Sequence, residues 1–274
     1  MKIISNYHTH NELCKHAVGT IEDYALRAIE CHYVEIGMSD HAPLPDDLKD
    51  KLFSRRMNFD EYYNIYLPEL ERLKIKYQAQ IKILKSLEVE YLEPLKKCYP
   101  IFLKNADYLI LGQHYFNHNG EYISVYNVDN PELVESYTKS VVEGVSSGIF
   151  KILAHPEVFL WRYKTWDEHC EKASRQIIEA CIKNNVIMEL NANGIRNSKL
   201  REKFIVYKDP NTNIEEIQYS YPNKRFFEIV KEYDVPIIIN DDAHNPNYIH
   251  DASTEEAYKL AETLNLKVIN LLKI

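Results

Sequence analysis

The chain has 274 residues, of which 45% are hydrophobic and 27% charged, and its formal net charge is −8 at pH 7. This composition is typical of a folded globular protein and excludes disordered and fibrous chains. The acidic balance argues against a nucleic-acid-binding surface, so we expect no nucleic-acid partner.

Apolar, β-branched segments alternate with amphipathic helical segments along the whole chain. The predicted strands span residues 2–8, 33–40, 81–90, 108–114, 152–155, 186–191 and 236–242. The predicted helices span residues 21–32, 60–78, 130–146, 166–184, 226–233 and 253–263. This alternation predicts an α/β fold with a parallel sheet covered by helices, and seven strands favour a closed barrel. Without repeats or linkers, we expect a single domain over residues 1–274.

Two connections are longer than the usual few residues, namely 42–58 and 192–224. Both follow the carboxyl end of a predicted strand, which is the face where barrels build their active sites. We therefore expect them to act as lids or as substrate-binding segments.

No apolar stretch of about 18 residues, the length of a membrane-spanning helix, is present, so we expect no membrane partner. The first residues, MKIISNYHTHNELCKH, lack the apolar segment of a secretory signal and predict a cytoplasmic protein. The five cysteines are scattered and predict reduced thiols. No glycine-rich nucleotide-binding motif occurs, and no pattern indicates an oligomeric state.

Histidines and carboxylates recur at the carboxyl ends of the predicted strands. The residues in question are His8, His10, His16, His41, Glu88, Glu90, His114, His155, Asp242 and His244. A spacing of two on an extended strand places both side chains of each pair on one face. Clustered ionisable groups destabilise a fold unless something pairs with them. Imidazole and carboxylate ligands suit zinc, iron or manganese, so the pattern predicts a metal site.

Seven segments in this order resemble the polymerase and histidinol phosphatase (PHP) family of metallohydrolases. They are HTH at residues 8–10, CKHA at 14–17, GMSDHAP at 37–43, LEVEY at 87–91, LGQH at 111–114, AHP at 154–156 and DDAH at 241–244. The resemblance covers nearly the whole chain. The SDHAP and LEVEY segments, with ELNANGIR at 189–196, are similar to the histidinol-phosphate phosphatase branch.

The resemblance implies a distorted (β/α)7 TIM-like barrel with three divalent metal ions at the carboxyl face of its strands. The implied ligands are His8, His10, Glu88 and Asp242 for the first ion, Glu88, His114 and His155 for the second, and His16, His41 and His244 for the third. Either Glu88 or Glu90 could bridge two ions, and the resemblance favours Glu88. The other glutamate would then orient a histidine.

The activity that the resemblance implies is hydrolysis of L-histidinol phosphate to L-histidinol and phosphate, a step in histidine biosynthesis. A hydroxide that bridges the metals would attack the phosphorus in line. The predicted catalytic residues are Asp242, His244, His155 and Arg196. The predicted substrate-binding residues are Arg162 and Arg196 as a phosphate clamp, Asn191 as a polar contact, and Asp46 for the substrate's cationic groups. No residue stands out as the general acid for the leaving group.

Three other functions fit parts of this pattern. The same centre could act on another small phosphate ester, a nucleotide or a DNA 3′ end, although the acidic balance argues against DNA. An amidohydrolase-like C–N hydrolase also begins with H-x-H, but the S-D-H and D-x-H segments fit it poorly. A non-catalytic metal-binding module would be expected to have lost some ligands.

Overall fold

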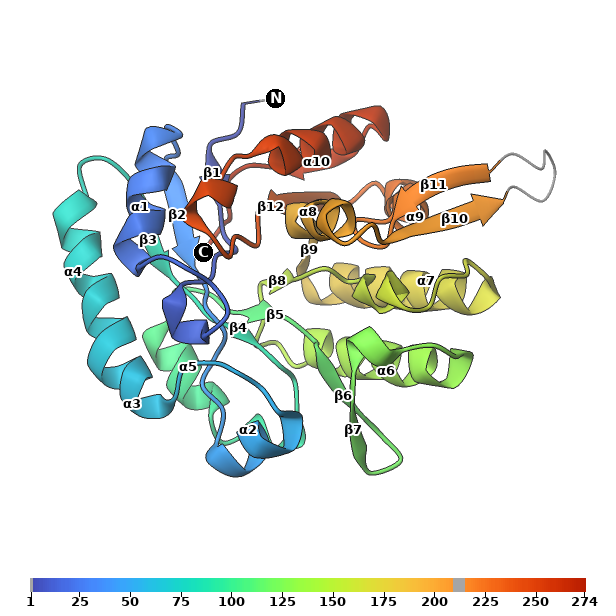
Figure 1. The fold of residues 1–274 in the computed structure, drawn as a ribbon, viewed down its shortest axis with the longest axis horizontal. Coiled ribbons are helices and arrows are strands. Elements are labelled where there is room, and N and C mark those ends of the chain that lie inside the picture. Colours follow the sequence, from blue (N-terminus) through green and yellow to red (C-terminus); the bar gives the residue numbers. More distant parts are fainter. Residues whose placement is uncertain (1, 209–214) are drawn as a thin grey trace.

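The computed structural model describes residues 2–208 and 215–274, and its strands form two parallel sheets around one centre (Figure 1). The smaller sheet has the order β1 (Ser5–Asn6), β2 (Glu35–Met38) and β3 (Lys82–Lys85). The larger has the order β13 (Lys267–Ile269), β12 (Pro236–Asn240), β9 (Ile187–Asn191), β8 (Ile152–Leu153), β5 (Ile110–Leu111) and β4 (Glu88–Val89). Every pairing within these two sheets is parallel.

Two single-residue bridges join the sheets into a ring. Thr9 pairs with Ala243 and His41 pairs with Glu88, just beyond the ends of the flanking strands. The ring therefore runs β1–β2–β4–β5–β8–β9–β12 and back to β1. This arrangement confirms the expected distorted (β/α)7 barrel. Most buried apolar side chains belong to one contiguous cluster, in line with the single domain that we propose.

Helices cover the outside of the ring. They are α1 (Ile21–Glu30), α4 (Leu67–Tyr77), α5 (Tyr99–Asn105), α6 (Pro131–Ser146), α7 (Glu168–Asn184), α9 (Lys224–Glu232) and α10 (Ala252–Thr263). Figure 1 shows α6 and α7 side by side on one flank and α1 and α4 on the opposite flank. The helix predicted at 60–78 is continuous but contains a π-helical segment, Tyr62–Tyr66, between α3 (Phe59–Glu61) and α4.

The strand predicted at 81–90 is divided in two. Its first part, β3, pairs with β2, and its second part, β4, pairs with β5. Ser86 and Leu87 lie between the two parts and belong to neither strand, although Ser86 N still donates to the Met38 carbonyl of β2 at 2.8 Å.

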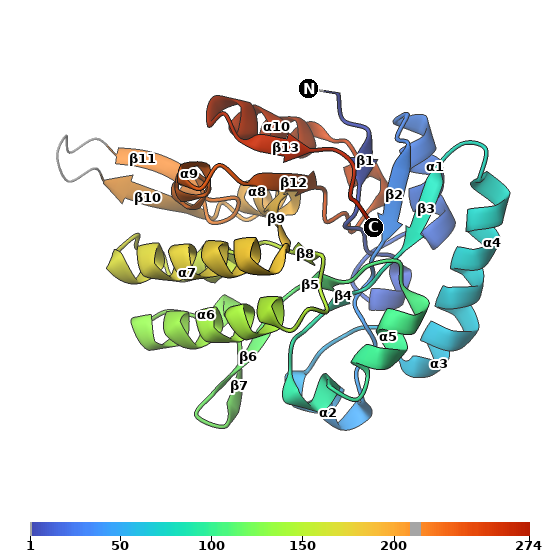
Figure 2. The same ribbon diagram turned by 180° about the vertical axis from the view of Figure 1, so that it is seen from behind.

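Both long connections contain secondary structure that the sequence pattern did not predict. The first holds α2 (Asp46–Leu52), and the second holds α8 (Ala192–Leu200) and a hairpin of β10 (Phe204–Lys208) and β11 (Glu215–Tyr219). Figure 2 shows this hairpin projecting from the body of the molecule. A second hairpin joins β6 (Tyr115–His118) to β7 (Glu121–Ser124). In the described residues, no helix is long and apolar enough to cross a membrane.

Short helical turns complete the described chain. They span Glu12–Cys14, Glu93–Leu95, Val125–Asn127, Val158–Trp161 and Pro246–Tyr248. Those at residues 12–14, 158–161 and 246–248 follow the carboxyl ends of β1, β8 and β12, so they lie on the face where the predicted ligands gather.

Candidate metal centre

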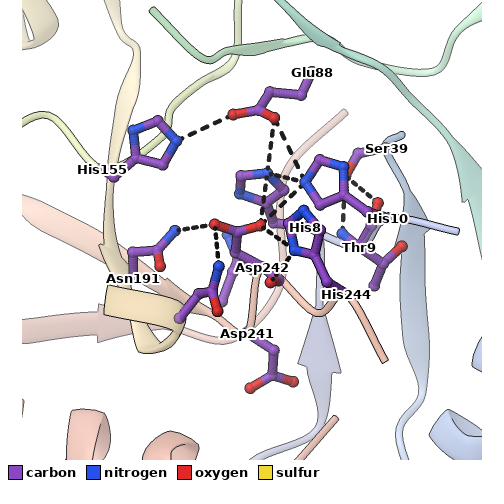
Figure 3. A network of polar contacts seen from close by, with 12 residues as sticks. His8, Thr9, His10, Ser39, Glu88, His155, Asn191, Asp241, Asp242 and His244 are labelled. Atoms are coloured by element: carbon purple, nitrogen blue, oxygen red, sulfur yellow. Dashed lines mark hydrogen bonds and ion pairs between the residues drawn. The ribbon is translucent and has the colours of Figure 1, made fainter. Parts of the chain in front are cut away.

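All nine side chains that the sequence named as metal ligands converge where the barrel strands end. They are His8, His10, His16, His41, Glu88, His114, His155, Asp242 and His244. Figure 3 shows six of them, His8, His10, Glu88, His155, Asp242 and His244. The His10 ring centroid lies 4.2 Å from that of His244 and 4.4 Å from that of His41. Seven histidines at such spacing, with two carboxylates among them, form one cluster.

Glu88 lies in the middle of the cluster, and its two oxygens face different histidines (Figure 3). Oε2 is 3.0 Å from His41 Nδ1 and 3.5 Å from His10 Nε2. Oε1 is 3.1 Å from His155 Nε2 and 3.6 Å from His114 Nε2. A carboxylate with one oxygen toward each of two donor groups has the disposition of a bridging ligand.

Asp242, which follows β12, completes the cluster. Its Oδ1 is 3.1 Å from His10 Nε2 and 3.4 Å from His244 Nδ1. Its Oδ2 accepts hydrogen bonds from the side-chain amides of Asn191 and Asn193, each at 3.2 Å. The two asparagines therefore fix the carboxylate so that Oδ1 faces the histidines.

The hydrogen bonds of His8 and His10 set the direction of their lone pairs. His8 Nδ1 is 2.8 Å from a carboxylate oxygen of Glu189, and His10 Nδ1 is 3.4 Å from one of Asp40. A carboxylate only accepts, so each Nδ1 carries the proton and each Nε2 presents a lone pair in the neutral ring. These two Nε2 atoms are 3.1 Å apart. Two facing lone pairs would repel each other, so the pair holds either a metal ion or a proton; against burial, the neighbouring carboxylates raise the pKa of both rings, that of His10 to about 9.

Other histidines of the cluster are held by hydrogen bonds from Nδ1 in the same way. His114 donates from Nδ1 to Glu90 Oε1 at 3.1 Å, and His16 donates from Nδ1 to the Cys14 carbonyl at 2.8 Å. Asp242 Oδ1 and His41 Nδ1 are buried and make no hydrogen bond despite their close neighbours. Oxygen and nitrogen atoms that approach closely without hydrogen-bonding geometry are typical of ligands directed at a common ion, so the residues present fit a metal centre.

The cluster also holds its two carboxylates and His244 in the forms that bind metal. Burial alone would raise the pKa of Glu88, but His114 and His8 hold it well below its usual range. The pKa of Asp242 is likewise held low, against burial, by His8 and His10. Burial and the neighbouring His10 lower the pKa of His244 to about 3. At neutral pH both carboxylates are therefore ionised and His244 is a neutral imidazole.

Backbone geometry supports these positions. His155 and Asp242 have φ angles of 31° and 45°, in the left-handed region that non-glycine residues rarely adopt. At Gly112 a Cβ atom would lie 2.0 Å from Glu88 Oε1, so a side chain there would displace Glu88. The glycine between β5 and His114 thus leaves room for the central carboxylate.

The two glutamates of the LEVEY segment have separate roles in the geometry. Glu90 does not face the centre. Its Oε2 accepts from the His114 backbone N–H at 2.8 Å, and its Oε1 lies 3.3 Å from Arg56 Nη2. This arrangement supports Glu88 as the bridging residue and Glu90 as the residue that orients His114.

The centre opens into a cavity of about 700 Å³. Its lining includes residues that the sequence pattern did not single out, namely Tyr126, Trp161, Asn193, Arg201 and Tyr221. Three of them follow barrel strands, namely Tyr126, Trp161 and Tyr221. Their position after a strand was the only feature of the sequence that could have marked them as cavity residues. An aromatic side chain at such a position is more often part of the core.

Two predicted substrate-binding residues lie away from this cavity. The Arg162 side chain is 54% exposed and pairs with Asp129 at 3.4 Å. The turn Val158–Trp161 directs Trp161 into the cavity and leaves Arg162 outside its lining. Asp46 begins α2 and lines a separate surface depression with Asn58. The structure therefore does not bring Arg162 or Asp46 to the metal centre.

The other two predicted substrate-binding residues, Asn191 and Arg196, lie close to the centre, but their side chains hydrogen-bond to other residues of the protein. Asn191 is buried, and its amide donates to Glu189 as well as to Asp242. Arg196 lines the cavity, but its Nε and Nη2 donate to the two oxygens of Asp251 at 2.8 and 3.0 Å. Its Nη1 donates to the Asp241 carbonyl at 3.2 Å. Both residues are placed to position the site.

Replacing Glu90 by Gln is expected to lower activity by about 10- to 100-fold and to reduce metal content, because His114 loses its charged acceptor. The measurement is metal analysis beside phosphate release. Glu93→Gln, on an exposed side chain of the following turn, is the matched control and should leave both unchanged. Full metal content and full activity in Glu90→Gln would show that Glu90 does not orient His114.

Comparison with known proteins places this geometry in a family. The PHP domain family matches residues 6–193, more than half of the chain. A "probable histidinol-phosphatase" from Schizosaccharomyces pombe is 25% identical over 268 residues, which cover 91% of this chain and 82% of that protein. The histidinol-phosphatase from Bacillus subtilis is 24% identical over 221 residues, covering 69% of this chain and 80% of that protein.

A solved structure shares the fold. It is the histidinol phosphate phosphatase from Lactococcus lactis complexed with zinc, L-histidinol and phosphate, with a TM-score of 0.68 and 17% sequence identity. The match covers 98% of this chain and 95% of that one. From the extent of the family match, the chain belongs to the PHP domain family.

Proposed function

We propose that this chain is a metal-dependent phosphomonoesterase that hydrolyses L-histidinol phosphate to L-histidinol and phosphate. The observation that carries the proposal is the cluster around Glu88, in which seven imidazoles and two ionised carboxylates face one another at the base of a cavity. Relatives that align over most of the chain are named histidinol-phosphatases. The Lactococcus lactis structure of the same fold contains zinc, L-histidinol and phosphate.

We further propose three divalent ions per chain. The proposed ligands are His8, His10, Glu88 and Asp242 for the first ion, Glu88, His114 and His155 for the second, and His16, His41 and His244 for the third. Zinc is the ion that the nitrogen-rich donor set and the Lactococcus lactis structure favour, and iron and manganese also suit these ligands.

Divalent ions bound here would neutralise the phosphate dianion and lower the pKa of a bound water, which supplies hydroxide at neutral pH. The protein's part is positioning. Asn191 and Asn193 hold the Asp242 carboxylate, and Glu90 holds His114. Trp161 and its neighbouring tyrosines give the leaving group a flat apolar surface away from the ions. We retain Asp242, His155 and His244 as ligands and assign Arg196 to positioning.

Phosphate release from L-histidinol phosphate, beside a panel of other monoesters, tests the proposal when metal content is determined on the same sample. We expect a strong preference for L-histidinol phosphate at two to three metal ions per chain. A metal-loaded protein that ignores L-histidinol phosphate but hydrolyses another ester would overturn the substrate and keep the hydrolase. A metal-loaded protein inactive on every ester would overturn the phosphatase.

Removal of metal is expected to destabilise the fold as well as to abolish activity. A ligand bound only by the native state stabilises it by about 4 kcal/mol when its concentration is a thousand times Kd. Thermal unfolding should therefore shift to a lower Tm after chelation and return when zinc is added back. Identical unfolding curves with and without chelator would contradict a metal centre built into the barrel.

A further inference from the structure

The cavity above the metal centre is lined with positive side chains. Its arginines are Arg55, Arg56, Arg196 and Arg201. Among the described residues of its lining, the carboxylates are Glu88 and Asp242, and both face the metal centre. A cationic part of a substrate would therefore meet no carboxylate on the cavity wall outside that centre.

Two of the four arginines already pair with acids, since Arg56 lies 3.3 Å from Glu90 and Arg196 lies 2.8 Å from Asp251. Arg201 differs from them. Its guanidinium carbon lies 6.0 Å from the centroid of the Trp161 ring, and no described acidic side chain lies within ion-pair distance of it.

A second cation shares that ring. Lys203 Nζ lies 5.0 Å from the Trp161 ring centroid, and it too has no acidic partner among the described residues. The ring alone offers each cation only weak compensation. An anionic group bound at the Trp161 ring would gain an ion pair with a charge that has no described acidic partner.

Aromatic side chains connect these cations to the metal centre. The Trp161 ring centroid is 5.9 Å from that of Tyr221, which is 6.0 Å from that of His155. Tyr126 makes a parallel connection, with centroids 6.2 Å from Trp161 and 6.3 Å from His114. A flat group can lie along this wall with one end at the metal centre and the other at the two cations.

We propose that Trp161, Arg201 and Lys203 form a second anion-binding subsite, which receives a negative group at the far end of the substrate. The chain would then bind phosphate monoesters whose leaving group carries a planar ring and a second anionic group, in addition to L-histidinol phosphate. The inference rests on the proposed function in one respect, that the phosphoryl group occupies the metal centre.

Three benzylphosphonates that differ only at the para position, with a carboxylate, a methyl or an aminomethyl group, test the subsite. Their C–P bond is not hydrolysed, so calorimetry on the zinc-loaded protein measures binding alone. We expect the carboxylate compound to bind about tenfold more tightly than the aminomethyl compound, since each exposed ion pair contributes up to about 1 kcal/mol. The double variant Arg201→Gln/Lys203→Gln should bring this ratio close to one.

Arg162→Gln is the matched control, because Arg162 follows Trp161 directly but lies outside the cavity lining. It should keep the ratio. The subsite is overturned if the carboxylate compound does not bind, if the three compounds bind equally, or if the preference survives in the double variant. None of these results depends on turnover, so a failure to hydrolyse L-histidinol phosphate remains a separate outcome that concerns the metal centre's activity.

Discussion

Asp242→Asn is expected to reduce phosphate release by roughly a thousandfold or more, because hydrolysis of a phosphate monoester is extremely slow without catalysis and here depends on bound metal. Asp242 supplies one of the two carboxylates in a cluster of histidines. The amide keeps the side chain's shape but removes its negative charge. Metal content should fall in parallel, while circular dichroism shows a retained fold.

The neighbouring Asp241 provides the control for this variant. Its carboxylate points away from the centre and accepts from Thr254 Oγ1 at 2.5 Å and from the His250 backbone N–H at 3.2 Å. Asp241→Asn should cost about 1 kcal/mol of stability and keep its metal. If Asp242→Asn kept full metal occupancy and most of its activity, the ligand assignment would be wrong.

Arg196→Ala is expected to lower the free energy of unfolding by about 3 kcal/mol, because it leaves the Asp251 carboxylate and the Asp241 carbonyl without their buried donor. The sequence placed Arg196 in a phosphate clamp, which predicts a different result, weaker phosphate binding with the metals retained. Urea denaturation of the metal-loaded protein measures the first effect, and KM for L-histidinol phosphate measures the second.

Arg201→Ala is the matched control, since Arg201 lies at the end of the same helix but has no described acidic partner. It should leave stability within about 0.5 kcal/mol of the original. Arg196→Lys should recover only part of the loss, because an ammonium cannot reproduce the two-pronged contact with Asp251. Unchanged stability in Arg196→Ala together with a raised KM would restore Arg196 to the phosphate clamp.

The ligand cluster could be predicted from sequence because its signal is local. His8 with His10, and Asp242 with His244, are two residues apart at strand ends, and parallel strands place such ends on one face of a barrel. The choice of Glu88 over Glu90 needed more. It depends on Gly112, which has no side chain and so leaves space for the Glu88 carboxylate.

What the sequence did not predict depends on contacts between distant residues. Arg196 pairs with Asp251, 55 positions later, and no spacing rule links them. Helix α8 contains Asn193 and Gly194, which are weak helix formers, and it begins because the Asn191 side chain accepts a hydrogen bond from the Gly194 backbone N–H. The direction of Arg162 follows from a single turn after β8.

The two bridges that close the barrel, at Thr9–Ala243 and His41–Glu88, lie within the ligand cluster itself. Each bridge pairs a single residue on either side. At the first, Ala243 N donates to His8 O at 3.2 Å and His10 N donates to Ala243 O at 2.9 Å; at the second, Ala42 N donates to Glu88 O at 2.9 Å and Glu88 N donates to the Ser39 and Asp40 carbonyls at 3.0 and 3.1 Å. By contrast, β9 and β12 are paired over four residues. Metal ions bound by the cluster would therefore help to hold the two sheets together at these bridges. Amide hydrogens of Ala42 and Ala243 should exchange with solvent much faster after chelation, while those between β9 and β12 stay protected.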